Sequence, residues 1–303
     1  MKRTFSILGD SISTFEGCIP QDFRVYYEGE RCEATGVQAV EDTWWAQVIA
    51  HLDGEFLANA SYSGSMVEGA GFPAGNSDRR VAALAAGGRA PDVVIVFMGI
   101  NDYGWGGAEA QAAGRGNALP ECLDEAALGE PRVAGLAPAD AAERFGEAYS
   151  QMLGRVRAAY PDAEVWCCTL CPGRVAGSAR STFAYNLRGV HFNRYNDAIR
   201  AAAAQRGCRV ADVRAQGRDY EALDGTHPTA RGMQQFAALV IAAMEAAGGA
   251  ADGCGADAAG GEGEVDGAFG APSSAEPCTG RPCVGCPQAA STSNQWLLVC
   301  QKR

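Results

Sequence analysis

Short apolar runs alternate with amphipathic segments along most of the chain. The apolar runs, which we predict to be strands, cover residues 4–8, 55–60, 92–98, 163–169 and 208–213. The amphipathic segments, which we predict to be helices, cover residues 43–52, 77–86, 138–160, 192–205 and 229–246. Continuous apolar strands separated by amphipathic helices are typical of a parallel sheet with both faces covered. The pattern therefore predicts an α/β fold, a doubly wound three-layer α/β/α sandwich.

Three long connections, residues 15–42, 103–137 and 171–190, follow the carboxyl ends of predicted strands. Open α/β sheets bind their ligands at this edge, so we expect these loops to build the substrate pocket. The connections carry six aromatic residues: Phe15, Phe23, Tyr26, Tyr27, Tyr103 and Trp105. These rings can line an apolar acyl pocket, stack on a sugar or pack the loops onto the domain, and the sequence leaves the three alternatives open.

The composition changes near residue 248. Residues 248–277 are rich in Gly, Ala, Asp and Glu and almost free of large apolar residues, a composition typical of a disordered linker. We therefore predict one folded domain over residues 1–247, a linker over 248–277 and a small Cys-rich C-terminal tail over 278–303.

The overall charge and hydropathy exclude several classes of partner. A net charge of −11 and a pI near 4.8 leave no basic footprint for a nucleic acid. Apolar runs stay well below the roughly 18 residues that a membrane span needs, so we expect no membrane partner. The basic residues Lys2 and Arg3 are followed by an apolar stretch that ends at Leu8, too short for an export signal. We accordingly expect a cytoplasmic protein whose cysteines are reduced or bind metal.

Candidate functional residues stand just past three of the predicted strands. Ser11 follows the first strand in the segment Gly-Asp-Ser-Ile, and Gly64 ends the segment Asn-Ala-Ser-Tyr-Ser-Gly behind the second. Asn101 follows the third strand in the segment Gly-Ile-Asn-Asp. Each segment alone is also compatible with a turn or a helix N-cap, so the signal comes from the three together and in order.

A carboxylate and an imidazole complete this set near the end of the predicted domain. Asp224 stands three residues before His227, which is one of only three histidines. In a tight turn such a carboxylate can receive the Nδ1 proton, and Nε2 is then free to accept the proton of Ser11. The sequence therefore predicts Ser11 as a nucleophile, His227 as its base and Asp224 as the orienting carboxylate.

Ser11, Gly64, Asn101 and His227, in this order and each behind a strand, resemble the four blocks of the SGNH (GDSL-type) hydrolase family. The second block departs from the family pattern at Ser61, where the family often has glycine. The resemblance implies a flavodoxin-like five-stranded parallel sheet in the order 2-1-3-4-5. It also implies an oxyanion hole made of the backbone amides of Ser11 and Gly64 and the side chain of Asn101.

The activity that the resemblance implies is hydrolysis of carboxylic esters through an acyl-enzyme on Ser11, with a small-molecule ester as partner and no cofactor. Because no long apolar stretch suggests lipid binding, short-acyl or carbohydrate esters are favoured. Two alternatives stay open. One is an acyltransferase on the same machinery, and the other is a degenerate hydrolase fold that serves as a binding module. The oligomeric state is left open as well.

The tail contains four cysteines, Cys278, Cys283, Cys286 and Cys300, around an apolar Trp-Leu-Leu-Val run. Four thiolates are enough for a tetrahedral structural zinc, which would order an island too small to fold alone. Only one pair has the Cys-x-x-Cys spacing, so a disordered tail and a redox-sensitive pair remain alternatives.

Overall fold

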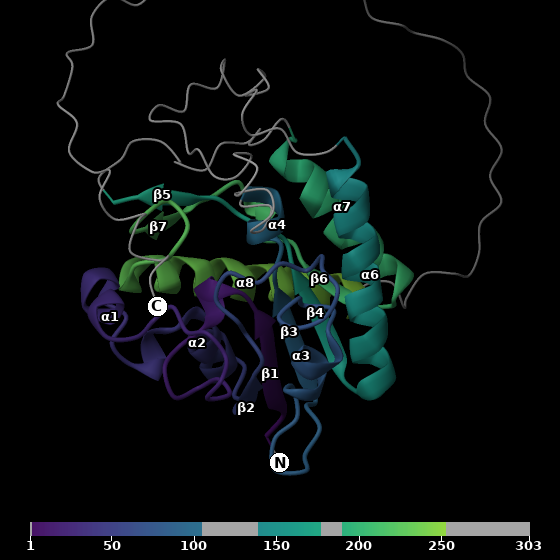
Figure 1. Ribbon diagram of the computed structural model, residues 1–303, viewed down its shortest axis with the longest axis horizontal. Helices are drawn as coiled ribbons and strands as arrows, with labels where there is room; N and C mark the ends of the chain where they lie inside the picture. Colours follow the sequence, from purple (N-terminus) through teal and green to yellow (C-terminus); the bar gives the residue numbers. More distant parts are fainter. Residues whose placement is uncertain (1, 105–138, 177–189, 253–303) are drawn as a thin grey trace, which may run out of the picture. The chain divides into compact units, whose positions relative to one another are not determined.

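The main sheet consists of five parallel strands in the order β2-β1-β3-β4-β6, which confirms the predicted order (Figure 1). The computed structural model describes residues 2–104, 139–176 and 190–252. The five strands are β1 (Thr4–Gly9), β2 (Glu55–Asn59), β3 (Val93–Phe97), β4 (Glu164–Cys168) and β6 (Arg209–Ala211). The central strands β1 and β3 are buried along their whole length because helices cover both of their sides.

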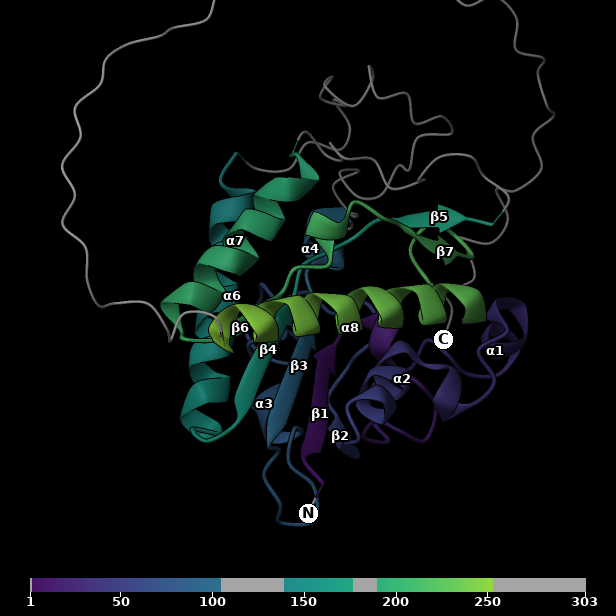
Figure 2. The ribbon, with the colours of Figure 1, turned by 180° about the vertical axis from the view of Figure 1, so that it is seen from behind.

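Helices cover both faces of this sheet. They are α1 (Glu30–Thr35), α2 (Trp44–His51), α3 (Asp78–Ala82), α4 (Ile100–Gly104), α6 (Ala141–Ala159), α7 (Phe192–Gln205) and α8 (Ala230–Asp252). Three 3-10 turns, η1 (Ser11–Ser13), η2 (Val40–Asp42) and η6 (Arg214–Gln216), supplement them. Helices α2 and α8 pack together on one face, and α3, α6 and α7 lie on the other (Figure 2). The predicted three-layer sandwich is therefore confirmed.

Two helix ends differ most from the prediction. Helix α3 ends at Ala82 instead of residue 86, because Gly87 and Gly88 form a tight turn in which Ala86 pairs with Arg89. Helix α8 continues past residue 246 to Asp252. Alanine favours helix in this stretch, and two glycines are not enough to stop it.

A second, two-stranded sheet was not predicted. Strands β5 (Gly173–Val175) and β7 (Tyr220–Ala222) pair in parallel, beyond the carboxyl ends of the main strands (Figure 1). Three-residue strands are too short to show a periodic pattern, which explains the omission. A Cβ added at Gly173 would lie 2.3 Å from the carbonyl oxygen of Gly225, so β5 supports the loop that leads from β7 into α8.

The described residues all fall within a compact unit that spans Met1–Asp257. The division into a domain, a linker over 248–277 and a tail over 278–303 stays a prediction. Trp105 and the four tail cysteines lie outside the described residues. Within the described ranges, no helix is both long enough and apolar enough to span a membrane.

Candidate active site

Ser11 opens the 3-10 turn that leaves β1 at the carboxyl edge of the sheet. The side chain of Asp10 accepts a hydrogen bond from the amide of Ile12 at 3.1 Å and so caps this turn. Burial raises the pKa of Asp10 to about 6, while the hydrogen bond from Ile12 and the charges of His227 and Arg80 oppose that rise. Asp10 thus shapes the backbone that presents Ser11.

The second sequence block anchors the same turn. Asn59 Nδ2 donates to the carbonyl oxygen of Ser13 at 2.8 Å, and Asn59 Oδ1 accepts from the amide of Ser61 at 2.9 Å. The indole of Trp45 adds a bond of 3.0 Å to the same Ser13 carbonyl. The amide side chain of Asn59 therefore ties the end of β2 to the turn that carries Ser11.

The structure brings the three residues predicted as a triad into contact. Ser11 Oγ lies 2.9 Å from His227 Nε2, and His227 Nδ1 lies 2.7 Å from Asp224 Oδ2. Since Nδ1 must hold the proton to donate to a carboxylate, Nε2 is the acceptor for the Ser11 hydroxyl. The distance between Ser11 Oγ and His227 Nε2 is within the range for proton transfer between a nucleophile and its base. More than two hundred residues of sequence separate Ser11 from His227, so only the fold could bring them together.

The loop from β7 to α8 holds Asp224 by its own backbone. Asp224 Oδ1 accepts from the amides of Thr226 and His227 at 3.0 and 2.8 Å. Two tyrosine hydroxyls also hold the loop by hydrogen bonds. Tyr220 donates to the Thr226 carbonyl, and Tyr27 donates to the Pro228 carbonyl. The backbone on both sides of His227 in the sequence is therefore held by hydrogen bonds, which fix the position of the imidazole.

The pKa of Asp224 is held below its ordinary value. Burial acts to raise it, but the charge of His227 and the hydrogen bonds from His227 and Thr226 together outweigh burial. The carboxylate consequently stays ionised throughout the neutral pH range. The ionised form is the one that accepts a hydrogen bond from the N–H of His227 Nδ1.

The imidazole of His227 is also stacked on an aromatic ring. The rings of Tyr26 and His227 are 3.6 Å apart between centroids and nearly parallel, with an interplanar angle of 6°. The guanidinium of Arg31 covers Tyr26, 4.7 Å from its centroid. Five of the six aromatic residues singled out in the sequence lie in the described ranges, and all five are buried: Phe15, Phe23, Tyr26, Tyr27 and Tyr103. Of the three alternatives for these rings, packing is the one that the structure favours.

The other two predicted site residues, Gly64 and Asn101, meet at Ser65. Asn101 Nδ2 donates to the carbonyl oxygen of Ser65 at 2.9 Å, which leaves its second N–H available. Gly64 has a φ of +79°, and a Cβ added there would meet no atom within 4 Å. The segment thus has a backbone conformation that favours glycine and open space beside it.

The backbone amides around these residues differ in whether they donate to a protein acceptor. Within the described ranges, Ser63 donates to the Arg24 carbonyl and Ser65 to the Tyr62 carbonyl. Among the described residues, no backbone acceptor is found for the amides of Ser11 and Gly64. Unused amides next to a serine and its base are the donors that an oxyanion needs.

Asp102, the residue after Asn101, is buried and holds the far side of the same segment. Its carboxylate accepts from the amides of Val67 and Glu68 at 2.9 and 3.0 Å. Burial raises the pKa of Asp102 to about 7, although both amide bonds act in the opposite direction. The residues from 61 to 68 are therefore fastened at several points to the ends of β1 and β3.

Sequence reasoning missed one buried charged residue that touches this region, Arg80 of α3. Its side chain is completely buried and donates to the ends of β1 and β2. An arginine in an Ala- and Arg-rich chain gives no sequence signal of its own. Its burial is visible only in three dimensions.

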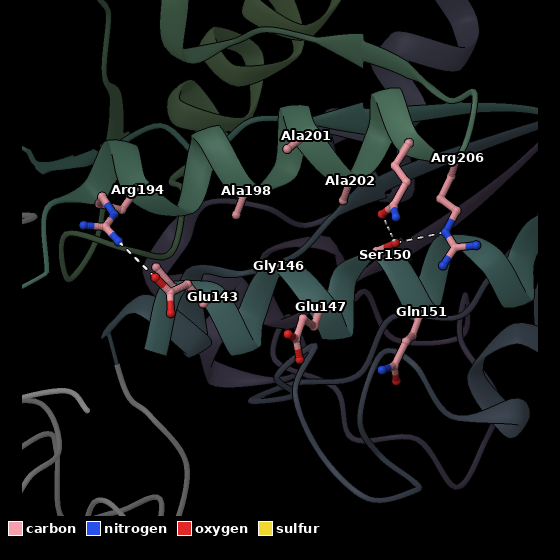
Figure 3. Close-up of a pocket in the computed structure, with 12 residues that line it drawn as sticks. Glu143, Gly146, Glu147, Ser150, Gln151, Arg194, Ala198, Ala201, Ala202 and Arg206 are labelled. Atoms are coloured by element: carbon pink, nitrogen blue, oxygen red, sulfur yellow. Dashed lines mark hydrogen bonds and ion pairs between the residues drawn. The ribbon is translucent and has the colours of Figure 1, made fainter. Parts of the chain in front are cut away.

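A separate groove of about 610 Å³ lies between α6 and α7 (Figure 3). Three polar contacts cross it: Arg194 approaches Glu143 at 3.9 Å, Arg206 donates to Ser150 at 2.9 Å, and Ser150 donates to Gln205 at 2.6 Å. Ser11, Asp224 and His227 are not among its lining residues, so this groove is not the site described above. In the part of the chain that the structure describes, no group of three or more His, Cys, Asp or Glu side chains could hold a metal ion. The zinc prediction concerns tail cysteines outside that part.

Comparison with known families assigns the chain. A family model described as GDSL-like lipase/acylhydrolase matches residues 3–172, more than half of the sequence. The chain therefore belongs to this family, as its motifs predicted, and is an esterase or acyl hydrolase, an enzyme that hydrolyses ester bonds. The match ends before Asp224 and His227, so their place in the site rests on the geometry above.

Solved structures show the same fold. A protein described as a GDSL-like lipase from Bacteroides uniformis is 22% identical, with a TM-score of 0.51, over 81% of this chain and 96% of that one. Another described in the same way from Bacteroides ovatus is 20% identical, with a TM-score of 0.50, over 81% and 99%. A search of curated proteins gave no match.

Proposed function

We propose that the protein is a serine esterase that cleaves carboxylic esters through an acyl-enzyme on Ser11. The observation that supports this most directly is the continuous pair of hydrogen bonds from Ser11 through His227 to Asp224. A lone serine or histidine at these positions would be compatible with a structural role. A serine, an imidazole and an ionised carboxylate in series form the arrangement that makes a hydroxyl nucleophilic.

The reaction proceeds in two steps. Ser11 Oγ attacks the ester carbonyl carbon while its proton passes to His227 Nε2, and the imidazolium then gives that proton to the leaving alcohol. Water next gives a proton to Nε2, attacks the acyl-enzyme and releases the acid, and the proton returns to Ser11. Asp224 stays ionised throughout and stabilises the imidazolium that forms in each step.

Negative charge develops on the carbonyl oxygen in both steps. The amides of Ser11 and Gly64 and the second N–H of Asn101 are the donors that we propose for it. Each such donor is worth about 2.7–4 kcal/mol of transition-state stabilisation. The open space beside Gly64 leaves room for the substrate.

Short acyl groups, including those of carbohydrate esters, are the substrates that we propose. A long acyl chain needs a contiguous apolar surface. The described residues expose three large apolar side chains, and of these only Leu223 adjoins the loop of Asp224 and His227. The aromatic rings that might have lined a long pocket are packed into the domain instead.

Labelling with a fluorophosphonate tests the nucleophile. Wild-type protein should be labelled and should hydrolyse p-nitrophenyl acetate, whereas Ser11→Ala should do neither and still unfold at the wild-type temperature. Ser150→Ala, a serine in the α6–α7 groove, is the control and should behave like wild type. Full activity in Ser11→Ala would rule out the assignment.

A series of p-nitrophenyl esters from acetate to palmitate, measured with and without acceptor alcohols, tests the substrate. We expect kcat/KM to be highest for the shortest acyl groups and the free acid to be the main product. Transfer products in the presence of alcohols would make the enzyme an acyltransferase, and a preference for palmitate would contradict the short-acyl proposal.

A further inference from the structure

The guanidinium of Arg80 uses all of its hydrogen-bond donors inside the protein. Nε donates to the Ala60 carbonyl at 2.5 Å, and one Nη2 hydrogen goes to the Gly9 carbonyl at 2.5 Å. Nη1 donates to the Pro73 carbonyl at 2.7 Å and to Ser65 Oγ at 2.9 Å. The last Nη2 hydrogen faces the sulfur of Met98 at 3.8 Å. With five donors and five acceptors the group is fully satisfied.

Three of the five acceptors lie just before the segments that carry the proposed oxyanion donors. Gly9 is the last residue of β1, just before the turn with Ser11, and Ala60 directly follows β2. Met98 directly follows β3 and leads to Asn101. A single buried side chain thus connects the carboxyl ends of three neighbouring strands.

Ser65 links this guanidinium to the donors themselves. It is the residue after Gly64, and its hydroxyl accepts from Arg80 while its carbonyl accepts from Asn101. The direction of the Gly64 amide therefore depends on where Arg80 and Asn101 hold Ser65. A misplacement of about 1 Å in such a site can lower the rate on the order of 10²-fold.

We propose that Arg80 is a positioning residue that presets the oxyanion hole, by holding Gly64 in register with Ser11 and Asn101. The inference rests on the proposed serine mechanism. Lysine could not replace this arginine, because its ammonium has three donors on a single point, whereas the planar guanidinium reaches carbonyls in several directions. A neutral side chain would remove a hydrogen-bond donor from the carbonyls of Gly9, Ala60 and Pro73.

Arg80 keeps its charge in this environment. Burial lowers its pKa to about 9, and the negative charge of Asp10 opposes that change. The guanidinium is therefore protonated at neutral pH, where all five donors are needed.

The decisive variant is Ser65→Ala, which removes one bond of Arg80 and leaves the buried charge and the Asn101 bond in place. We expect kcat per active site to fall about tenfold with KM nearly unchanged, since a misaligned donor costs less than the ~10²–10³-fold loss of a donor removed outright. Sites are counted by fluorophosphonate titration, so that loss of folded protein does not count as loss of kcat.

Ser77→Ala is the matched control. Ser77 is a buried serine directly before α3, and its hydroxyl has no hydrogen-bond partner among the described residues. This variant should keep the wild-type kcat. In addition, Arg80→Lys and Arg80→Met should lower kcat by at least ~10²-fold, and adding Ser65→Ala to either should cost little more.

The outcomes separate the two proposals. Wild-type kcat in Ser65→Ala would overturn the role of Arg80 even if the Arg80 variants fail to fold. If Ser11→Ala retained activity, the serine mechanism itself would be wrong, whatever the Ser65 result. A loss in Ser65→Ala together with an inactive Ser11→Ala supports both.

Discussion

Two aspartates near the proposed catalytic groups, Asp224 and Asp102, are held in the same way and yet have opposite pKa shifts. Each accepts hydrogen bonds from two successive backbone amides. The side chain of Asp224 contacts the imidazole of His227, whereas Asp102 is buried. The pKa of Asp224 is lowered and that of Asp102 is raised to about 7.

The comparison shows that two amide bonds do not decide the charge of a carboxylate. Burial acts to raise the pKa of both groups, and of the two only Asp224 has an imidazole at 2.7 Å, whose charge and hydrogen bond add to the backbone bonds and outweigh burial. Asp224 is thus suited to an electrostatic role and Asp102 to a structural one. The predictions that follow test this division.

The largest effect is expected for Asp224→Asn. The amide of asparagine would donate to Nδ1, so that Nε2 would carry the proton and could not accept one from Ser11. We expect kcat to fall on the order of 10⁴-fold with little change in stability. Initial rates on p-nitrophenyl acetate measure it, and Asp53→Asn at an exposed site is the control. A loss below tenfold would show that Asp224 is not the orienting carboxylate.

Asn101→Ala should have the second largest effect. It removes one transition-state donor and should lower kcat about 10²–10³-fold, while KM changes less. Steady-state kinetics with a short ester separates the two constants. A large rise in KM at unchanged kcat would instead make Asn101 a residue that binds the ground state.

The last prediction concerns the stability of the fold and Asp102, and it leaves catalysis aside. A raised pKa means that the folded state holds a proton that the unfolded chain releases near pH 4. Protonated Asp102 therefore contributes to the free energy of unfolding at low pH, and this contribution is lost as the pH rises toward 7. Relative to Asp102→Asn, the free energy of unfolding of the wild type should decrease by up to ~4 kcal/mol over this window.

Urea unfolding of both proteins at pH 4, 5.5 and 7 measures this difference. The variant itself serves as the reference, because it retains every other titrating group, including Asp10. A difference that does not change with pH would show that Asp102 is ionised in the folded state at all three values.

The local residue pattern was enough to predict the layers of the fold. The apolar runs at residues 4–8 and 92–98 became β1 and β3, because strands covered on both faces are built mostly from apolar side chains. The ends of elements and the short elements were harder to predict from the sequence. The strand pair of β5 and β7 depends on contacts with distant residues, which no local pattern contains.

In the candidate site, too, some features could be predicted from the sequence and others could not. Ser11, Gly64, Asn101, Asp224 and His227 could be singled out from the sequence, because nucleophile, donors and base need particular residue types at strand ends. Whether they meet was decided by the tertiary structure, which places Ser11 and His227 2.9 Å apart. The stacking of Tyr26 on His227 and the burial of Arg80 were decided there too. An aromatic ring or a guanidinium gains its role from the groups around it, and those come from distant parts of the chain.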